Sequence, residues 1–202
     1  MVAASGRIGP SGRPYPRESD AVDRALKARL QARFGDIASG PIRQRHDETE
    51  LRIPAGAAPD VLRALHDEPE FGFLMLSDLA GVDTGDHMQV VYHLWSETTS
   101  DWLRVVADRI PRDDPRTPSI TFLWKGAEWM EREAYDMFGI VFEGNRDLRR
   151  IYMPPDYTSF PLRKDFFLPD DAARSPGGGV RHMERSHAPQ GAPAGTIRRV
   201  KA

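Results

Sequence analysis

The stretch WKGAEWMEREAYDMFGIVFEGNRDLRRIYMPPDYTSFPLRKD (124–165) is the most densely specified part of the 202-residue chain. It begins as a charged, aromatic helix at residues 127–138, and Gly139 interrupts it. One face of this helix is apolar and should cover a sheet; it carries Ala127, Met130, Ala134, Met137 and Phe138. Beyond residue 142 the periodicity ends, and prolines exclude a further helix. The stretch therefore predicts a junction between a folded domain and an extended arm.

The opposite face of the helix carries Glu128, Arg132 and Asp136 at i, i+4 spacing. Such pairs contribute only about 0.2–0.5 kcal/mol each when exposed, so a solvated ladder of charges is one interpretation. A catalytic interpretation would pair Glu131 or Glu133 with Asp136 as general acid and base. It is weak, because Arg132 would keep all of these carboxylates ionised.

Cofactor and nucleophile chemistry has little basis in the sequence. The chain has no cysteine, which excludes disulfides and thiolate ligation of iron–sulfur clusters. The histidines are scattered, and none stands at helical ligand spacing from a carboxylate of the stretch; they are His46, His66, His87, His93, His182 and His187. GxGxxG, Walker A, GxSxG and CxxC motifs are absent.

Recognition is the remaining chemistry. Arginines alternate with aromatic residues between residues 146 and 167, a composition typical of the energetically dominant residues of protein interfaces. A groove for single-stranded nucleic acid would have the same composition. However, the pI is near 6.3, and Asp147, Asp156 and Asp165 interrupt the basic strip, so nucleic acid is disfavoured.

The rest of the chain predicts an α+β domain with a mainly antiparallel sheet and helices on one face. The order is helix, hairpin, helix, three strands and two helices. The predicted elements are a helix at 19–34, a hairpin of 42–46 and 49–53, a helix from residue 59 to Pro69, strands at 71–76, 88–95 and 102–110, and helices at 120–124 and 127–138. We divide the chain into a disordered N-terminus (1–18), the α+β domain (19–142), an extended docking arm (143–169) and a flexible basic tail (170–202).

Charge is distributed unevenly along the chain. Residues 60–101 carry nine acidic residues against Arg63 alone, whereas residues 172–202 carry five arginines and Lys201 against Glu184 alone. This separation suits a chain between unlike partners, although a solvated acidic face with a free basic tail would also explain it. The N-terminus lacks the apolar segment of a secretory signal, which indicates a cytoplasmic location.

Three motifs, in this order and spacing, resemble one known family: EREAYDMFGIVFEG (131–144), DLRRI (147–151) and FPLRKDF (160–166). The family is the C subunit of proton-pumping NADH-quinone oxidoreductase, respiratory complex I. The resemblance extends more loosely over residues 20–168. One departure stands out: Asn145-Arg146 replaces the usual His-Pro before Asp-Leu-Arg-Arg.

The resemblance implies a non-catalytic subunit of the peripheral arm of the complex, on the cytoplasmic side of the bacterial inner membrane. It would brace the quinone-binding D subunit and the neighbouring iron–sulfur subunits, would bind no cofactor or metal itself, and would meet the membrane only through the complex. FMN, iron–sulfur clusters, NADH and a quinone belong to the complex. The motif residues implied to lie at partner interfaces are Glu131, Arg132, Glu133, Tyr135, Asp136, Arg149, Arg150, Arg163, Lys164 and Asp165.

Three alternatives stay open. Relatives of this subunit occur in membrane-bound hydrogenases and in ferredoxin-driven complexes, and the electron donor binds elsewhere in all of them. The other two alternatives are a stand-alone hydrolase using the carboxylates at 131–136 and a nucleic-acid binding module.

Overall fold

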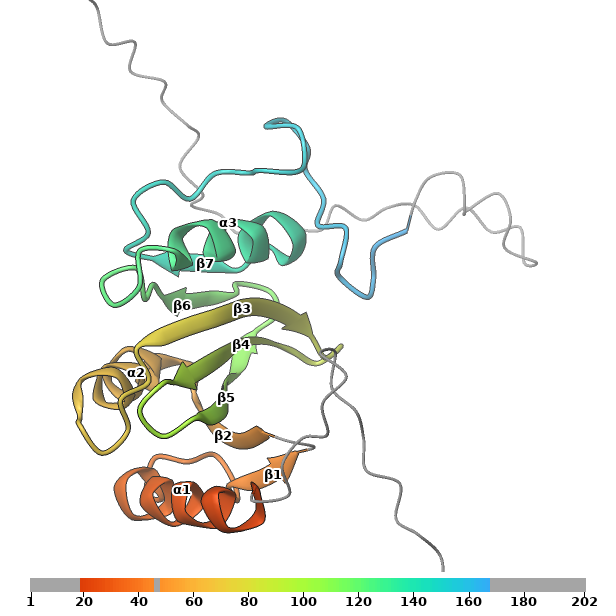
Figure 1. Ribbon diagram of the computed structural model, residues 1–202. Coiled ribbons are helices and arrows are strands. Elements are labelled where there is room, and N and C mark those ends of the chain that lie inside the picture. The colour runs from red at the N-terminus through yellow and green to blue at the C-terminus, as the bar shows by residue number, and fades with distance from the viewer. Residues whose placement is uncertain (1–18, 46–47, 168–202) are drawn as a thin grey trace, which may run out of the picture.

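The computed structural model describes residues 19–45 and 48–167 and centres on a five-stranded sheet (Figure 1). The strand order is β1-β2-β5-β4-β3, with β1 (Arg43–Arg45), β2 (Glu48–Pro54), β3 (Met75–Asp83), β4 (His87–Ser96) and β5 (Asp101–Pro111). Every neighbouring pair is antiparallel except β2 and β5, which run parallel. The predicted α+β class with a mainly antiparallel sheet is therefore confirmed.

Three helices lie over one face of this sheet: α1 (Ser19–Phe34), α2 (Ala58–Asp67, preceded by the short 3-10 helix η1, Ala55–Ala57) and α3 (Ala127–Phe138). Apolar residues of all three join alternate strand residues in one buried cluster, which includes Leu26, Leu30, Leu62, Leu65 and Ala134 from the helices and Leu51, Ile53, Val90, Tyr92, Leu103 and Val105 from the strands. Strand residues two positions apart share a face, so the core lies on a single side of the sheet.

A second sheet has two strands, one before α3 in the chain and one after it. It consists of the parallel pair β6 (Arg116–Pro118) and β7 (Val141–Glu143). Gly139 ends α3 with a φ of +77°, a conformation that favours glycine, and turns the chain into β7.

Two predicted elements are wrong. Residues 71–76 are not a strand covered on both faces: Phe71 and Phe73 are buried in a turn, where Gly72 has a φ of +58°. The strand is β3, which begins at Met75, where the side chain is half exposed. The predicted helix at 120–124 is a single turn, closed by bonds from the N–H groups of Leu123 and Trp124 to the carbonyl of Ile120.

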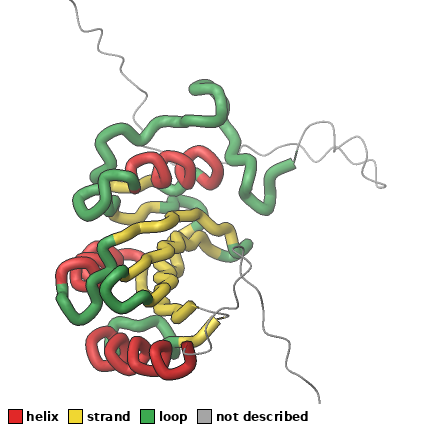
Figure 2. The backbone as a smooth tube through the Cα atoms, in the orientation of Figure 1, coloured by secondary structure: helices red, strands yellow, loops and turns green. Residues whose placement is uncertain are grey.

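Residues 144–167, which we call the arm segment, contain no helix or strand and run along α3 as loop (Figure 2). Much of the predicted arm is thus described, and it packs on its own domain. Residues 46–47, at the predicted hairpin turn, and the predicted N-terminus and basic tail lie outside the described residues.

Candidate protein–protein interface

Asp136, on the side of α3 that faces the arm segment, is fully buried. Its Oδ2 accepts hydrogen bonds from the backbone N–H groups of Ile151, Tyr152 and Met153 at 3.0, 2.7 and 3.0 Å. Its Oδ1 lies 2.6 Å from Nη1 of Arg150. Burial raises the pKa of Asp136, but these hydrogen bonds lower it by more, so the pKa falls below its ordinary value. A charged Asp136 therefore holds three successive peptide groups of the arm segment against α3.

Glu131, also on α3, is fully buried as well but has weaker partners. Its Oε1 accepts hydrogen bonds from the N–H of Ile120 at 2.8 Å and from Oγ of Ser119 at 3.1 Å. Its Oε2 accepts one from Nδ2 of Asn145 at 2.8 Å. Burial raises the pKa of Glu131, and the three hydrogen bonds oppose that rise only in part. Glu131 thus joins the turn before α3 to the start of the arm segment.

Asn145 stands where the family usually has histidine, and its amide has two roles. Nδ2 donates to Glu131, while Oδ1 accepts the N–H of Asp147 at 3.0 Å. The second bond forms a local turn of the kind that asparagine favours. Asn145 therefore supplies a donor to the buried carboxylate of Glu131.

The arginines of the motif also bind within the chain. Nε of Arg132 donates to the carbonyl of Arg149 at 3.1 Å, and Nη1 of Arg132 lies 3.6 Å from Asp147. Nη2 of Arg150 donates to the carbonyl of Ser159 at 3.2 Å. The charged face of α3 is therefore not a solvated ladder, because Arg132 and Asp136 pair with the arm segment.

Arg163 anchors the far part of the arm segment. Its Nε donates to the carbonyl of Phe138 at 2.6 Å, and its guanidinium lies 4.7 Å from the centre of the Phe160 ring. Nη2 is buried and lacks a hydrogen-bond partner among the described residues. A Cβ on Gly139 would come within 2.6 Å of the Phe160 ring, so this packing needs glycine there.

A second anchor joins the arm segment to the turn between β3 and β4. Asp83 accepts the N–H of Lys164 at 2.9 Å and pairs with Arg112 at 2.9 Å, while Arg112 also reaches Asp165 at 2.7 Å. Burial raises the pKa of Asp83, yet Arg112 and the N–H groups of Lys164 and Gly85 lower it to about 2. Both ends of the arm segment are thus bound through carboxylates of the domain.

The structure brings the ten predicted interface residues together along α3 and the arm segment, but at different depths. Glu131, Arg132, Asp136 and Arg163 are buried within this chain. The exposed members are Glu133, Arg149, Lys164 and Asp165, and Tyr135 and Arg150 are half-buried. Contact of these residues with a partner stays a prediction.

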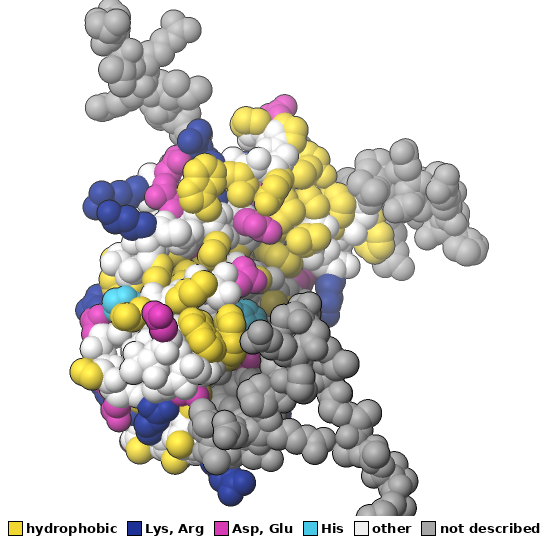
Figure 3. All heavy atoms as spheres, in the orientation of Figure 1, with side chains coloured by type: hydrophobic (Ala, Val, Ile, Leu, Met, Phe, Trp, Pro, Cys, Tyr) yellow, Lys and Arg dark blue, Asp and Glu magenta, His cyan; other side chains and the backbone are white. Residues whose placement is uncertain are grey.

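Tyr152 and Phe167, two aromatic residues of the strip of arginines and aromatics predicted at 146–167, are exposed, and so are Trp129 and Leu162, which the sequence did not single out as contact residues. We call Trp129, Tyr152, Leu162 and Phe167 the apolar strip; they are 62%, 65%, 55% and 66% exposed. Hydrophobic side chains gather over the arm segment in Figure 3. In the sequence these apolar residues are interspersed with the polar residues whose side chains bind within the chain, and this is the pattern that could have identified them. Large apolar side chains grouped on a surface are typical of binding sites for other proteins.

The described residues contain no group of three histidine, aspartate or glutamate side chains placed to hold a metal ion. Among them there is also no helix long and apolar enough to span a membrane. The carboxylates at 131 and 136 bind backbone and side-chain donors of this chain, so they do not face a substrate-sized opening together.

Comparison with known proteins defines the family. Residues 51–172 match the family described as the 30 kDa subunit of respiratory-chain NADH dehydrogenase. The second C subunit of NADH-quinone oxidoreductase from Rhizobium etli is 39% identical over 145 residues, covering 70% of this chain and 76% of that protein. The C subunit from a Mycobacterium species (strain KMS) is 36% identical over 172 residues, covering 83% and 74%. The chain belongs to this family, and the resemblance drawn from the motifs is confirmed.

Two solved structures share the fold. One is in the membrane-bound sulfane sulfur reductase, an archaeal respiratory membrane complex, with a TM-score of 0.59, 27% identity and coverage of 75% of this chain and 89% of that chain. The other is a trypsin-resistant fragment of Nqo5, with a TM-score of 0.50, 30% identity and coverage of 63% and 98%.

Proposed function

We propose that this chain is a non-catalytic subunit of the peripheral arm of a proton-translocating NADH:quinone oxidoreductase, on the cytoplasmic side of the bacterial inner membrane. In this role it braces the quinone-binding subunit and the neighbouring iron–sulfur subunits. The complex carries FMN and the clusters and uses NADH and a quinone, and this chain holds none of them.

One observation carries the proposal beyond family membership: the arm segment is bound inward by its polar groups and presents apolar side chains outward. Asp136 binds Arg150 and backbone N–H groups of the segment, Glu131 binds the side-chain amide of Asn145, and Asp83 binds the N–H of Lys164. Tyr152, Leu162 and Phe167 of the apolar strip are exposed on the same segment, and Trp129 is exposed on α3. Exposing several large apolar side chains to water is unfavourable unless another surface covers them, so we assign the apolar strip to partner contact.

A related complex with another electron donor is the second candidate. It is favoured by the likeness to a chain of the sulfane sulfur reductase complex, with a TM-score of 0.59 and coverage of 89% of that chain. The donor binds to other subunits in this interpretation, so this chain would have the same role in either complex.

The proposal is tested by purifying the tagged full chain from its native host in a mild detergent. We expect quinone-binding and iron–sulfur subunits to copurify, with NADH-dependent quinone reduction in the preparation. Reduction with ferredoxin but not with NADH would select the second candidate. A chain that purifies alone, or one with hydrolase activity or its own visible chromophore, would contradict the proposal.

A further inference from the structure

Strand β5 has a bulge in which a non-glycine residue adopts a left-handed conformation. Met88 of β4 pairs with Ile110, and Val90 pairs with Ala107, so Asp108 and Arg109 together oppose Gln89. Arg109 has a φ of +59°, which is unfavourable for a residue with a side chain. Strained backbone of this kind persists where the surroundings enforce it and often marks a binding residue.

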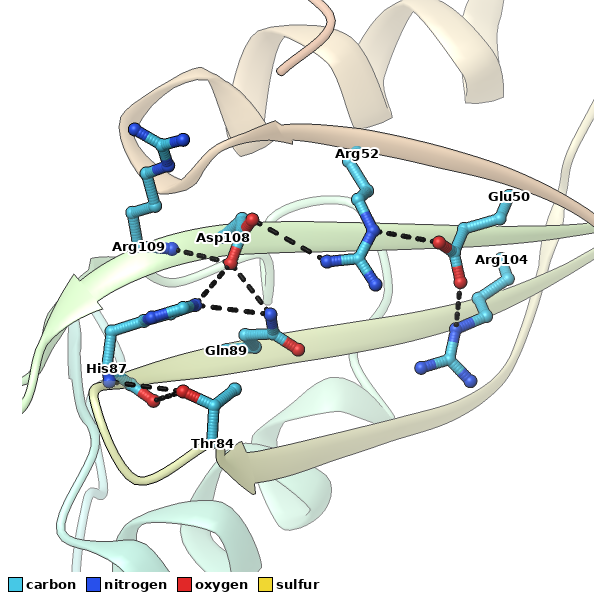
Figure 4. A network of polar contacts seen from close by, with 8 residues as sticks. All are labelled: Glu50, Arg52, Thr84, His87, Gln89, Arg104, Asp108 and Arg109. Atoms are coloured by element: carbon cyan, nitrogen blue, oxygen red, sulfur yellow. Dashed lines mark hydrogen bonds and ion pairs between the residues drawn. The ribbon is translucent and has the colours of Figure 1, made fainter. Parts of the chain in front are cut away.

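The two bulge residues point in different directions (Figure 4). Oδ1 of Asp108 lies 2.7 Å from both Nε2 of His87 and Nε2 of Gln89 and also accepts the N–H of Arg109 at 2.9 Å. Oδ2 lies 3.6 Å from Nη1 of Arg52. This network holds the bulge on the face of the sheet away from the helices. The side chain of Arg109 points away from the network, toward the turn of chain at the end of β2.

A hollow of about 510 Å³ lies beside the bulge, and Arg109 is one of the residues that line it. The ends of β2 and β5 form its apolar wall, through residues that include Pro54, Ala55, Ile110 and Pro111. Arg109 and Arg116 supply its positive charges, and Ser39 and Gly56 also line it. Asp108 lines it as well, but its carboxylate is already bound by His87, Gln89 and Arg52. An apolar wall lined also by the guanidinium-bearing Arg109 fits an extended peptide that carries a carboxylate.

Arg109 differs from the other arginines of this region in its pairing. Arg52, Arg104, Arg112 and Arg116 each pair with a carboxylate of the chain at 3.3 Å or less. Among the described residues, the guanidinium of Arg109 has no hydrogen-bond or ion-pair partner. The bulge therefore exposes an unpaired guanidinium beside an apolar hollow.

We propose that this hollow binds an acidic segment of a neighbouring protein of the complex, with Arg109 contacting one carboxylate of that segment. The inference rests on the proposed function, since it takes the neighbour from the same complex. The hollow would be a second contact surface, formed by β2, β5 and β6, and it shares no residue with the apolar strip.

Zero-length crosslinking in the purified complex tests the chemistry directly. Arg109→Lys places an amine at the site, and a carbodiimide then joins that amine to a carboxylate within ion-pair distance. Mass spectrometry should find an amide between position 109 and an Asp or Glu of another subunit. Arg24→Lys, at an exposed position of α1 outside the hollow, is the control and should give at least about tenfold less crosslinked peptide, because the proposal places no partner carboxylate there.

A complex that purifies intact but yields no adduct at position 109, or only adducts within this chain, overturns the inference and leaves the proposed function standing. A chain that purifies without other subunits overturns both.

A pair of glycine variants distinguishes the effect of losing the Arg109 side chain from the effect of relieving backbone strain. Ser100 has a φ of +56°, so Ser100→Gly and Arg109→Gly should both relieve strain and raise the Tm of the full chain. Only Arg109→Gly should also release the other subunits from the complex in a salt wash, by about tenfold relative to the wild type. A higher Tm with unchanged retention would show that Arg109 contacts no partner and would overturn the inference.

Discussion

At the scale of single residues, Glu131 and Asp136 show how partners decide the state of a buried carboxylate. Both lie on α3 and both are fully buried. Asp136 accepts bonds from three N–H groups and a guanidinium, which lower its pKa, whereas neutral donors leave the pKa of Glu131 raised. One family motif thus contains a carboxylate that stabilises the fold when charged and another that favours the protonated form.

Asp136→Asn should destabilise the full chain by about 3–5 kcal/mol, because it removes the charge that Arg150 and three peptide groups bind. Urea unfolding followed by circular dichroism measures the loss. Glu133→Gln, an exposed change on the same helix, should stay within about 0.5 kcal/mol of the wild type. Equal effects of the two variants would show that Asp136 does not anchor the arm segment.

The pH dependence of stability should differ in sign for the two residues. The pKa of Asp136 is lowered by folding, so its contribution is present above the unfolded pKa and is lost as the pH falls through the folded pKa. The pKa of Glu131 is raised, so its contribution is complete below the unfolded pKa and declines as the pH rises through the folded pKa. The free energy of unfolding of the wild type, relative to that of Glu131→Gln, should therefore fall as the pH rises from the unfolded pKa of Glu131 through its raised folded pKa. A difference that is independent of pH would contradict the raised pKa of Glu131.

Asn145→His should retain most of the stability, because an imidazole N–H can replace the amide donor to Glu131. Asn145→Leu should cost about 1–3 kcal/mol, since it leaves Oε2 of a buried carboxylate without its donor. Thermal unfolding of the two variants makes the comparison. Identical losses would mean that the bond to Glu131 contributes little.

At the scale of elements, the junction between α3 and the arm segment depends on Gly139. Its left-handed φ and the contact of the Phe160 ring leave no space for a side chain. Gly126, at the other end of α3, has helical dihedral angles and open space around it. The two glycines that bound the helix therefore differ in what they permit.

Gly139→Ala should lower the free energy of unfolding by about 2–4 kcal/mol and expose the arm segment to limited proteolysis. Gly126→Ala should be neutral or stabilising, by up to about 1 kcal/mol. The protease pattern is decisive, because a simple loss of global stability would not cleave the arm segment selectively. Unchanged proteolysis of Gly139→Ala would argue against packing of Phe160 on this glycine.

The sequence predicted most elements because their periodicity was intact. Leu26, Leu30 and Phe34 recur at every fourth position of the predicted helix at 19–34, and all three are buried. The start of β3 was misplaced, because Gly72 divides the apolar run at 71–76 and because a register shift between Leu76 and Asp78 interrupts the alternation. The periodicity of apolar residues does not predict the left-handed conformation of Gly72 or the register shift in β3.

The sequence predicted which residues make up the candidate site, but it did not predict that several of them bind within their own chain. The motif residues are adjacent, as the sequence indicated, yet Arg163 binds the carbonyl of Phe138, in its own chain. Helical spacing assigns Arg132 and Asp136 to one face, but it does not say which segment covers that face. The covering segment is irregular, so its pairing with α3 depends on tertiary contacts that a sequence pattern does not contain.

At the scale of the whole molecule, the two candidate contact surfaces lie on different elements. The apolar strip belongs to α3 and the arm segment, and the hollow belongs to the ends of β2 and β5 and to β6. Neither surface contains the buried carboxylates of the motif. Assembly and stability should therefore respond to different substitutions.

The triple variant Tyr152→Ser, Leu162→Ser, Phe167→Ser should leave the free energy of unfolding of the full chain within about 1 kcal/mol of the wild type, because these side chains are mostly exposed. Copurification of the other subunits should fall by at least about tenfold. Leu74→Ser, which alters an exposed apolar residue just before β3, serves as the control and should retain partners. Undiminished copurification of the triple variant would exclude the apolar strip as the contact surface.

The parallel pairing of β2 with β5 also sets an order of events in time. Thr49 pairs with Leu103, so the pairing of β2 with β5 closes a loop that contains α2, β3 and β4. Contacts between residues so distant in sequence form slowly, because ordering the loop costs entropy before the contact is gained. We expect the meander β3-β4-β5 to gain amide protection first in pulsed hydrogen exchange during refolding. Until then the edge of β5 that receives β2 would be open to other strands, so refolding should aggregate more as protein concentration rises.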